Sequence, residues 1–402
     1  MVPSAGGQPN GPLLQASDGN FYGTTRAGGI NGCTVGCGVI FRVTPDGVAS
    51  GLYSFGASAT DGTRPGGRLI QGRDGALYGT TTAGGAYGGG TVFKITLAGT
   101  YSLLYSFGST PADGLTPFSG LIEASDGSFY GTTASGGANH CNQIPVSGGN
   151  CGTVFKMSPS GAVTILHSFG ASASDGIQPE APLLQASDGN FYGTTVNGGA
   201  NICTTLPLGI DGCGSAFKMT PAGAVTTLYS FGRTLADPIA PQGPLIQGTD
   251  GALYGTSVSG GGGTCGGFFG CGTVYRMTAA GSVTVLHAFA VNAPGSIGPR
   301  LDGYGPSPFL IQARDGNFYG TTGSGGTVGG GNDLFGTVFK LTPSGQKTIL
   351  YSFGPADQPT NPVGGLIEAR DGALYGLTAY GQYFVRDGQT YSATGTIFKL
   401  VR

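Results

Sequence analysis

The stretch Leu13-Leu-Gln-Ala-Ser-Asp-Gly-Asn-Phe-Tyr-Gly-Thr-Thr25 decides the fold, because it returns six more times along the chain with small changes. The aspartate of its Asp-Gly pair marks the copies, at Asp18, Asp74, Asp126, Asp188, Asp250, Asp315 and Asp371. Successive copies lie 56, 52, 62, 62, 65 and 56 residues apart. Self-similarity sustained over seven copies indicates one repeat architecture.

Each repeat contains four short runs rich in Val, Ile, Thr, Tyr and Phe, separated by turn residues. Such runs predict strands, and no window shows a persuasive helical period. Four antiparallel strands, repeated seven times, predict an all-β fold, a seven-bladed β-propeller with four-stranded blades. We expect one propeller domain over residues 1–402, with blades that start near residues 13, 69, 121, 183, 245, 310 and 366.

Two polar positions recur in every repeat. A glutamine or glutamate occupies the innermost strand, at Gln15, Gln71, Glu123, Gln185, Gln247, Gln312 and Glu368. We expect it to find its hydrogen-bond partner in the neighbouring blade. A basic residue ends the third strand, at Arg42, Lys94, Lys156, Lys218, Arg276, Lys340 and Lys399. This residue and the Asp of the first turn share one face, so they predict a rim of weak ion pairs.

The seventh repeat is incomplete. It ends at Ile397-Phe-Lys-Leu-Val-Arg402, which corresponds to the third strand of a blade. We therefore expect the last blade to lack its outer strand. Ser4–Leu14 aligns with the loop Ser172–Leu184, so we infer that a signal sequence and the closing strand belong upstream of residue 1. The open edge of this blade invites pairing with another chain, which makes self-association an expectation.

Composition excludes several classes of protein. The formal net charge is −2 and only 9% of residues are charged, so the sequence lacks the basic surface that binding to nucleic acid requires. The apolar runs are far shorter than the roughly 20 residues that span a bilayer, so we expect no membrane insertion. The 82 glycines show no collagen period. No phosphate-binding loop or cofactor motif is present, and the sequence implies no cofactor.

All eight cysteines lie between the second and third strands of a repeat, two in each loop. The pairs are Cys33 and Cys37, Cys141 and Cys151, Cys203 and Cys213, and Cys265 and Cys271. Paired spacing of this kind predicts four local disulfides, each worth roughly 2–3 kcal/mol by loop entropy. Zinc thiolates are the alternative, but only Cys33 and Cys37 have a zinc-like spacing, so we expect no metal site. Disulfides favour an oxidising compartment.

The repeat resembles a known one. Gly120-Leu-Ile-Glu-Ala-Ser-Asp-Gly127, Phe129–Thr133, Gly152-Thr-Val-Phe-Lys156 and Leu104-Tyr-Ser-Phe-Gly108 are similar to the GloVer tandem repeat of bacterial extracellular proteins. The Asp-Gly-Asn-Phe-Tyr hairpin is more distantly similar to that of NHL-type propellers. The resemblance implies an extracellular or periplasmic protein of unassigned function, and it transfers no catalytic residue.

Binding sites are commonly built from variable loops on a rigid scaffold. Here the variable loops follow the second and fourth strands, so the candidates are residues that break the repeat there. They are His140, Glu180, Arg233, Asp237, Arg300, Asp302, Tyr304, Asp333, Tyr383 and Arg386. His167 and His287 replace tyrosine in a strand position and are interpreted as packing residues. The insertion at Val291–Pro308 is the longest departure of its kind.

Two functions fit these residues. The favoured hypothesis is a binding or adhesion module for a glycan or a cell-surface partner, because no catalytic constellation can be assembled. The alternative is an extracellular polysaccharide-active enzyme. A lyase could use Tyr304 as a base with Arg300 to neutralise a uronate. A glycoside hydrolase needs two carboxylates, and Glu180 with Asp237 or Asp302 is the pair the chain offers.

Overall fold

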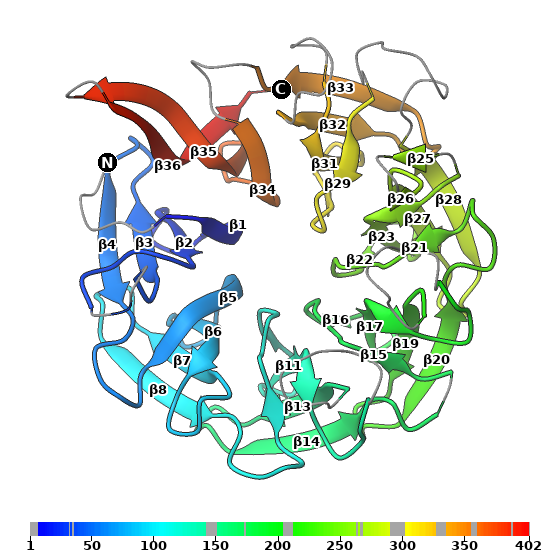
Figure 1. Ribbon diagram of the computed structural model, residues 1–402, viewed down its shortest axis with the longest axis horizontal. Helices are drawn as coiled ribbons and strands as arrows, with labels where there is room; N and C mark the ends of the chain where they lie inside the picture. Colours follow the sequence, from blue (N-terminus) through cyan, green and yellow to red (C-terminus); the bar gives the residue numbers. More distant parts are fainter. Residues whose placement is uncertain are drawn as a thin grey trace. The chain divides into compact units, whose positions relative to one another are not determined.

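The computed structural model describes residues 7–31, 33, 36–141, 151–172, 174–203, 212–262, 264–265, 268–289, 302–326, 335–354, 360–386 and 389–401. Side chains are described for these residues except 264, 265, 268, 269 and 380–394. This part of the chain contains strands and turns and no helix (Figure 1). It forms two compact units, residues 1–200 with 215–228 and residues 201–214 with 229–402.

The first unit carries four antiparallel sheets, each with strands in chain order from first to last. The sheets are β1 (Pro9–Gln15), β2 (Phe21–Thr25), β3 (Val39–Val43) and β4 (Ala49–Ser54); β5 (Gly62–Gln71), β6 (Leu77–Gly84), β7 (Thr91–Ile95) and β8 (Tyr101–Ser106); β10 (Ile122–Glu123), β11 (Phe129–Thr133), β13 (Thr153–Met157) and β14 (Val163–Ser168); and β16 (Leu184–Gln185), β17 (Phe191–Thr195), β19 (Ser215–Met219) and β20 (Val225–Ser230). Two short pairs accompany them, β9 (Gly114–Leu115) with β12 (Ser135–Gly136) and β15 (Gly176–Ile177) with β18 (Asn197–Gly198).

The second unit carries three further sheets. They are β22 (Ile246–Gln247), β23 (Leu253–Ser257), β27 (Thr273–Met277) and β28 (Val283–Ala288); β29 (Tyr304–Pro306) and β30 (Ile311–Gln312), both paired with β31 (Phe318–Ser324), then β32 (Thr337–Leu341) and β33 (Lys347–Ser352); and β34 (Thr360–Glu368), β35 (Leu374–Arg386) and β36 (Gln389–Leu400). Two short pairs are β21 (Pro238–Ile239) with β24 (Ser259–Gly260) and β25 (Thr264–Cys265) with β26 (Phe268–Phe269).

The seven sheets keep one register. The tyrosine of the second strand is always opposite the basic residue of the third, as in Tyr78 with Lys94 and Tyr375 with Lys399. This repetition confirms the all-β prediction: the chain is a seven-bladed β-propeller. Among the described residues the last sheet has three strands, β34, β35 and β36, as expected. Pairing of its edge with another chain, and the single domain, stay predictions.

Adjacent blades pack through aromatic side chains. The phenylalanine that follows the outer strand of one blade meets the third-strand ring of the next, edge to face. Phe107 and Phe155 show the contact, with ring centroids 5.1 Å apart and both side chains fully buried. Phe155 also explains the glycine of the second strand, because a Cβ on Gly131 would lie 2.6 Å from its Cζ atom. Aromatic pairs of this kind are worth more than their buried area alone.

The glutamine position links blades as predicted. The Gln71 side-chain oxygen accepts a hydrogen bond from the backbone N–H of Ser17, one blade earlier, at 2.8 Å. Its amide nitrogen donates to the Gly75 carbonyl in its own turn. The same acceptor role is filled by Glu123, Gln185, Gln312 and Glu368. Gln71, Gln185 and Gln312 therefore fix both their own first turn and the turn of the preceding blade. The carboxylates of Glu123 and Glu368 accept a hydrogen bond from the turn of the preceding blade.

The predicted rim forms, with a tyrosine added. Asp126 accepts hydrogen bonds from the Tyr130 hydroxyl at 2.9 Å and from Lys156 Nζ at 2.8 Å. Lys156 Nζ also lies 5.5 Å from the centre of the Tyr130 ring. The corresponding ion pairs join Asp74, Asp188, Asp250, Asp315 and Asp371 to the basic residues of their blades. Burial opposes ionisation of Asp126, but these hydrogen bonds and that of Ser128 N–H lower its pKa to about 2.

We expect Asp126→Asn to lower the free energy of unfolding by about 1 kcal/mol at pH 7, because the ion pair is solvent-exposed. The native pKa is depressed, so this stabilisation is present above pH ~4 and is lost as pH falls towards 2. Urea unfolding of both proteins at pH 7 and pH 3 measures the effect. Asp46→Asn, an exposed turn aspartate, is the control for charge; an equal loss in both variants would contradict a specific role.

Candidate functional site

At the start of the first strand of each blade, or in the loop just before it, lies a strained residue followed by proline. Six non-glycine residues there have φ between 54° and 61°: Gln8, Arg64, Thr116, Gln178, Ala240 and Asn361. Gly305, with φ 61°, takes the same place in the sixth blade. This left-handed conformation costs roughly 1–2 kcal/mol for a residue with a side chain. It is held because the N–H donates across blades, from Arg64 to the Cys37 carbonyl at 2.7 Å and from Gln178 to the Cys151 carbonyl at 2.9 Å.

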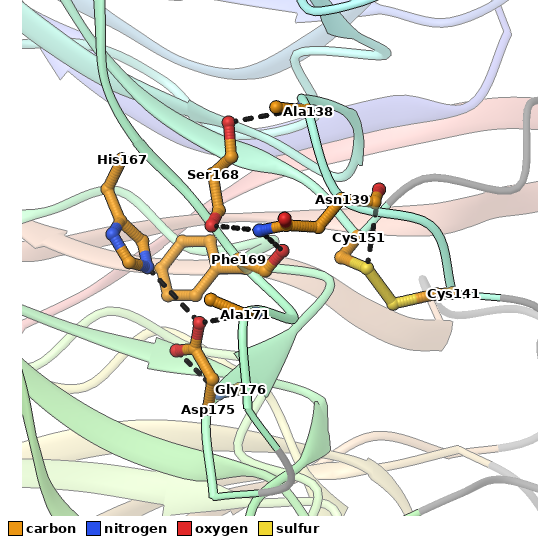
Figure 2. The surroundings of a disulfide bond; sticks show 10 residues. All are labelled: Ala138, Asn139, Cys141, Cys151, His167, Ser168, Phe169, Ala171, Asp175 and Gly176. Atoms are coloured by element: carbon orange, nitrogen blue, oxygen red, sulfur yellow. Dashed lines mark hydrogen bonds and ion pairs between the residues drawn. A yellow bond between two sulfur atoms is a disulfide. The ribbon is translucent and has the colours of Figure 1, made fainter.

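Disulfides brace the loops that receive these hydrogen bonds. Figure 2 shows the bond between Cys141 and Cys151, with Asn139 beside it. The Asn139 side-chain amide donates to the carbonyls of Ser168 and Phe169, at 2.8 and 2.9 Å (Figure 2). Asn31 and Asn201 make the same two bonds in their own blades. The recurrent Asn-x-Cys of these loops therefore ties each of them to the end of its outer strand.

Three of the four predicted disulfides are confirmed, Cys33–Cys37, Cys141–Cys151 and Cys203–Cys213. Cys271 is also disulfide-bonded, while the side chain of Cys265, its expected partner, lies outside the described residues. Across the part of the chain that the structure describes, no group of three or more His, Cys, Asp and Glu could hold a metal ion. Within the same part, the structure contains no helix of the length and hydropathy that a membrane span requires.

A second aspartate position organises the loop after each outer strand. Asp175 illustrates it: one oxygen accepts from the Ala171 N–H at 3.2 Å and lies 3.3 Å from His167 Nε2 (Figure 2). The other oxygen accepts from the Gly176 N–H at 3.0 Å. Asp61 and Asp113 do the same with tyrosine in place of His167. The packing interpretation of His167 fits this geometry.

Two predicted site residues, Asp237 and Asp302, occupy this loop position. Asp237 accepts hydrogen bonds from the Tyr229 hydroxyl at 2.7 Å and the Arg233 N–H at 3.0 Å. The exposed Arg233 guanidinium lies 4.2 Å from the centre of the Tyr229 ring. Asp302 lies 3.1 Å from His287 Nε2 and 2.6 Å from Lys347 Nζ. Both carboxylates therefore already have partners within the second unit.

The remaining predicted residues are spread along the chain. His140 is exposed beside the disulfide of Cys141. Tyr304 begins β29, opposite Ser324, and packs against a hydrophobic cluster of the second unit. Arg300 and Asp333 lie outside the described residues, as do the side chains of Tyr383 and Arg386 in β35.

Glu180 is the predicted residue that the structure places in a distinctive environment. It follows Pro179 in the loop before β16 and is half-buried. Burial raises the pKa of its carboxyl group, and the positive charge of Arg26 partly opposes the rise. Among the described residues, no hydrogen bond is made to this carboxyl group. Arg26, which follows β2, places its guanidinium carbon 5.3 Å from the ring centre of half-exposed Phe118.

Arg68 adds a second cation to this part of the first unit. It lies in β5, within a bulge between the paired residues Gly66 and Ile70. The close packing of its backbone and Cγ on Gly120, two residues after Phe118, places it next to the Phe118 loop. Its Nε atom is buried without a hydrogen-bond partner among the described residues. Arg26, Arg68, Phe118 and Glu180 are here called the Arg68 cluster.

Sequence reasoning found one member of the Arg68 cluster, Glu180, and missed three. The signal was present: at the positions of Arg26 and Arg68, the other repeats carry only uncharged residues. Most other basic residues fall in the rim column or next to the Asp of the first turn. Arg26 and Arg68 fall at neither of these two recurrent positions, so they could have been singled out as candidate site residues.

The repeat also identifies the family. The Gloeobacter/Verrucomicrobia repeat matches residues 2–206 and 144–384, which together span almost the whole chain. The chain belongs to the Gloeobacter/Verrucomicrobia repeat family. This confirms the resemblance seen in the sequence. No curated protein matches the chain.

Several solved structures are similar to this family member at low identity. A fungal alcohol oxidase in complex with copper is 13% identical, with 100% of this chain and 75% of that chain covered and a TM-score of 0.54. A 6-phosphogluconolactonase candidate from Bacteroides uniformis is 14% identical, with 90% and 95% covered and a TM-score of 0.49. A Dyadobacter fermentans protein of unknown function is 10% identical, with 100% and 97% covered and a TM-score of 0.48. The likeness to the alcohol oxidase, at 13% identity, shows the fold alone.

The two disulfides with different loop lengths should contribute differently to stability. Removing Cys141–Cys151 in a double serine variant should lower the free energy of unfolding by about 3 kcal/mol, and removing Cys33–Cys37 by about 2 kcal/mol. The difference follows from their sequence separations, 10 and 4 residues. Urea unfolding of both variants measures it. A larger loss for the shorter loop would contradict the loop-entropy account.

Asp302 should behave as a structural residue whose main partner is Lys347. The Lys347 side chain is only 5% exposed, and its Nζ lies 4.9 Å from the centre of the Phe289 ring. Asp302→Asn leaves this ammonium without its carboxylate and should lower stability by about 2 kcal/mol, less than a fully buried pair because Asp302 is partly exposed. Adding Lys347→Met should recover most of the loss in urea unfolding. Two independent, additive losses would contradict the pairing.

Proposed function

We propose that the protein is an extracellular binding propeller that recognises a glycan through the Arg68 cluster of its first unit. The observation that carries the proposal is the arrangement of Arg26 over Phe118 with Glu180 nearby. It combines a half-exposed aromatic ring with hydrogen-bonding groups that the described chain leaves unused. Sugar recognition needs such a pairing of flat apolar surface with precisely placed polar groups.

The location outside the cell is supported by the three disulfides. Such bonds persist in oxidising compartments and are rare where thiols are kept reduced. They also restrain the loops whose carbonyls receive the cross-blade hydrogen bonds. A restrained loop loses less conformational entropy when a ligand binds, so preformed loops support a binding role.

The enzyme alternative has one observation in its favour, the raised pKa of Glu180. A raised pKa is what a carboxyl group needs to act as a general acid. A glycoside hydrolase also needs a second carboxylate. The two aspartates expected to supply it, Asp237 and Asp302, are hydrogen-bonded to Tyr229 and paired with Lys347 respectively. Binding is therefore the better-supported function.

A glycan array, run beside assays for reducing ends and for unsaturated products, tests the proposal. We expect binding without turnover, and we expect Glu180→Ala, which removes the hydrogen-bonding carboxyl group, to weaken it about tenfold, the equivalent of about 1.4 kcal/mol. Asp46→Ala is the matched control, since it removes a carboxyl group from an exposed turn of the same unit. Product formation that Glu180→Ala abolishes would establish the enzyme instead. Failure to bind any glycan would overturn the proposal.

A further inference from the structure

We propose that Arg68 is the anchor for an oxyanion, so that the glycan bound by this propeller is acidic and carries carboxylate or sulfate groups. The choice of a glycan as carrier rests on the proposed function. The anion site itself rests on the position and partners of Arg68.

The backbone of β5 displays the Arg68 side chain through a bulge. Gly66 pairs with Thr80 and Ile70 pairs with Tyr78, so three residues of β5 stand opposite one residue of β6. A bulge of this kind changes the direction in which a side chain points and is frequent beside functional sites. Gly67, with φ 49°, takes the left-handed conformation that the bulge requires.

The neighbouring loop is shaped to accept Arg68. A Cβ on Gly120 would lie 3.0 Å from Arg68 Cγ and 2.6 Å from its carbonyl oxygen, so only glycine leaves enough room. Phe118 lies two residues earlier on the same segment and carries the Arg26 guanidinium over its ring. Arg68 and Arg26 therefore approach one loop from two different blades and bring two positive charges to it.

Arg68 lacks the hydrogen-bonded carboxylate partner that Arg276 of the rim has. Its buried Nε makes no hydrogen bond within the described chain, and the surrounding protein lowers the pKa of its guanidinium. By contrast, Arg276 donates from Nε and from a terminal nitrogen to Asp250. The buried Nε of Arg42 is also unbonded, but the Asp18 carboxylate is close enough to interact with its charge.

A half-buried guanidinium whose Nε is fully buried and which has no counter-ion among the described residues is unfavourable unless something else supplies one. The planar fork of arginine matches carboxylate and sulfate groups through two parallel hydrogen bonds. Arg26 adds to the attraction, and exposed Arg64, four residues before Arg68, supplies a third positive charge to the same strand. Burial favours the neutral form of Glu180, which reduces the repulsion that a bound anion would meet.

The test is calorimetric titration of the full chain at constant ionic strength with polygalacturonate, dextran sulfate and unmodified dextran. Arg68→Gln should weaken binding of an acidic polymer at least tenfold and should not change binding of dextran. Arg73→Gln is the matched control, because it removes the same charge from an exposed turn of β5's own blade. Arg68→Lys keeps the charge without the fork and should lose most of the affinity.

Sodium galacturonate and sodium sulfate are the small probes, followed by NMR of the arginine Nε–H groups in the unmodified protein. A shift confined to one arginine signal, absent in Arg68→Lys, supports the site even where Arg68→Gln folds poorly. Response to one probe alone identifies carboxylate or sulfate as the group recognised. Small anions that bind while every polymer fails would retain the anion site and overturn the glycan proposal. Equal binding of dextran and acidic polymers, unaffected by Arg68→Gln, would overturn the anion inference alone.

Discussion

The fold depends on the edge-to-face contact between the phenylalanine that ends one blade and the aromatic ring at the middle of the next. A single four-stranded sheet has two apolar faces and cannot cover either of them with its own residues. Phe107 against Phe155 and Phe169 against Phe217 supply that cover in the first unit, and Phe289 against Phe339 supplies it in the second. The glycine of each second strand, the polar rim and the loop geometry are all arranged around this contact.

Close packing between blades also creates polar groups that must be satisfied. On one face, the glutamine position bonds the turn of the preceding blade, as in Gln71 with Ser17. On the other face, the strained residue before proline donates its N–H to the preceding blade, as in Gln178 with Cys151. A buried N–H without a partner would cost about as much as a lost hydrogen bond. The left-handed backbone conformation therefore costs less than an unpaired buried N–H would. The disulfide keeps the carbonyl that accepts this hydrogen bond in place.

Sequence reasoning was accurate wherever a feature recurred in all seven repeats. Aligning the seven repeats reveals positions that carry the same kind of residue in each of them. These positions predict the strands, the number of blades, the links made by Gln71 and its equivalents, and the pairing of Asp126 with Lys156. Local cysteine spacing was sufficient to predict the three disulfides that the structure describes. The role of Asp302 was less accessible, because an insertion places it 15 residues after His287 instead of the usual 8. The Arg68 cluster was not predictable as a unit, because Arg26, Arg68, Phe118 and Glu180 come from four separate segments of the chain and meet only through packing between blades.

At the strained position before proline, the backbone conformation does not depend on which side chain is present. Its φ angle stays within a few degrees whether the residue is glutamine, arginine, threonine, alanine or asparagine. The following proline and the cross-blade hydrogen bond hold the backbone, and neither uses the side chain. This position can thus carry a different side chain in each blade while the backbone around it stays the same. A change of ligand specificity in such a molecule requires new side chains at existing positions, and it leaves the architecture untouched.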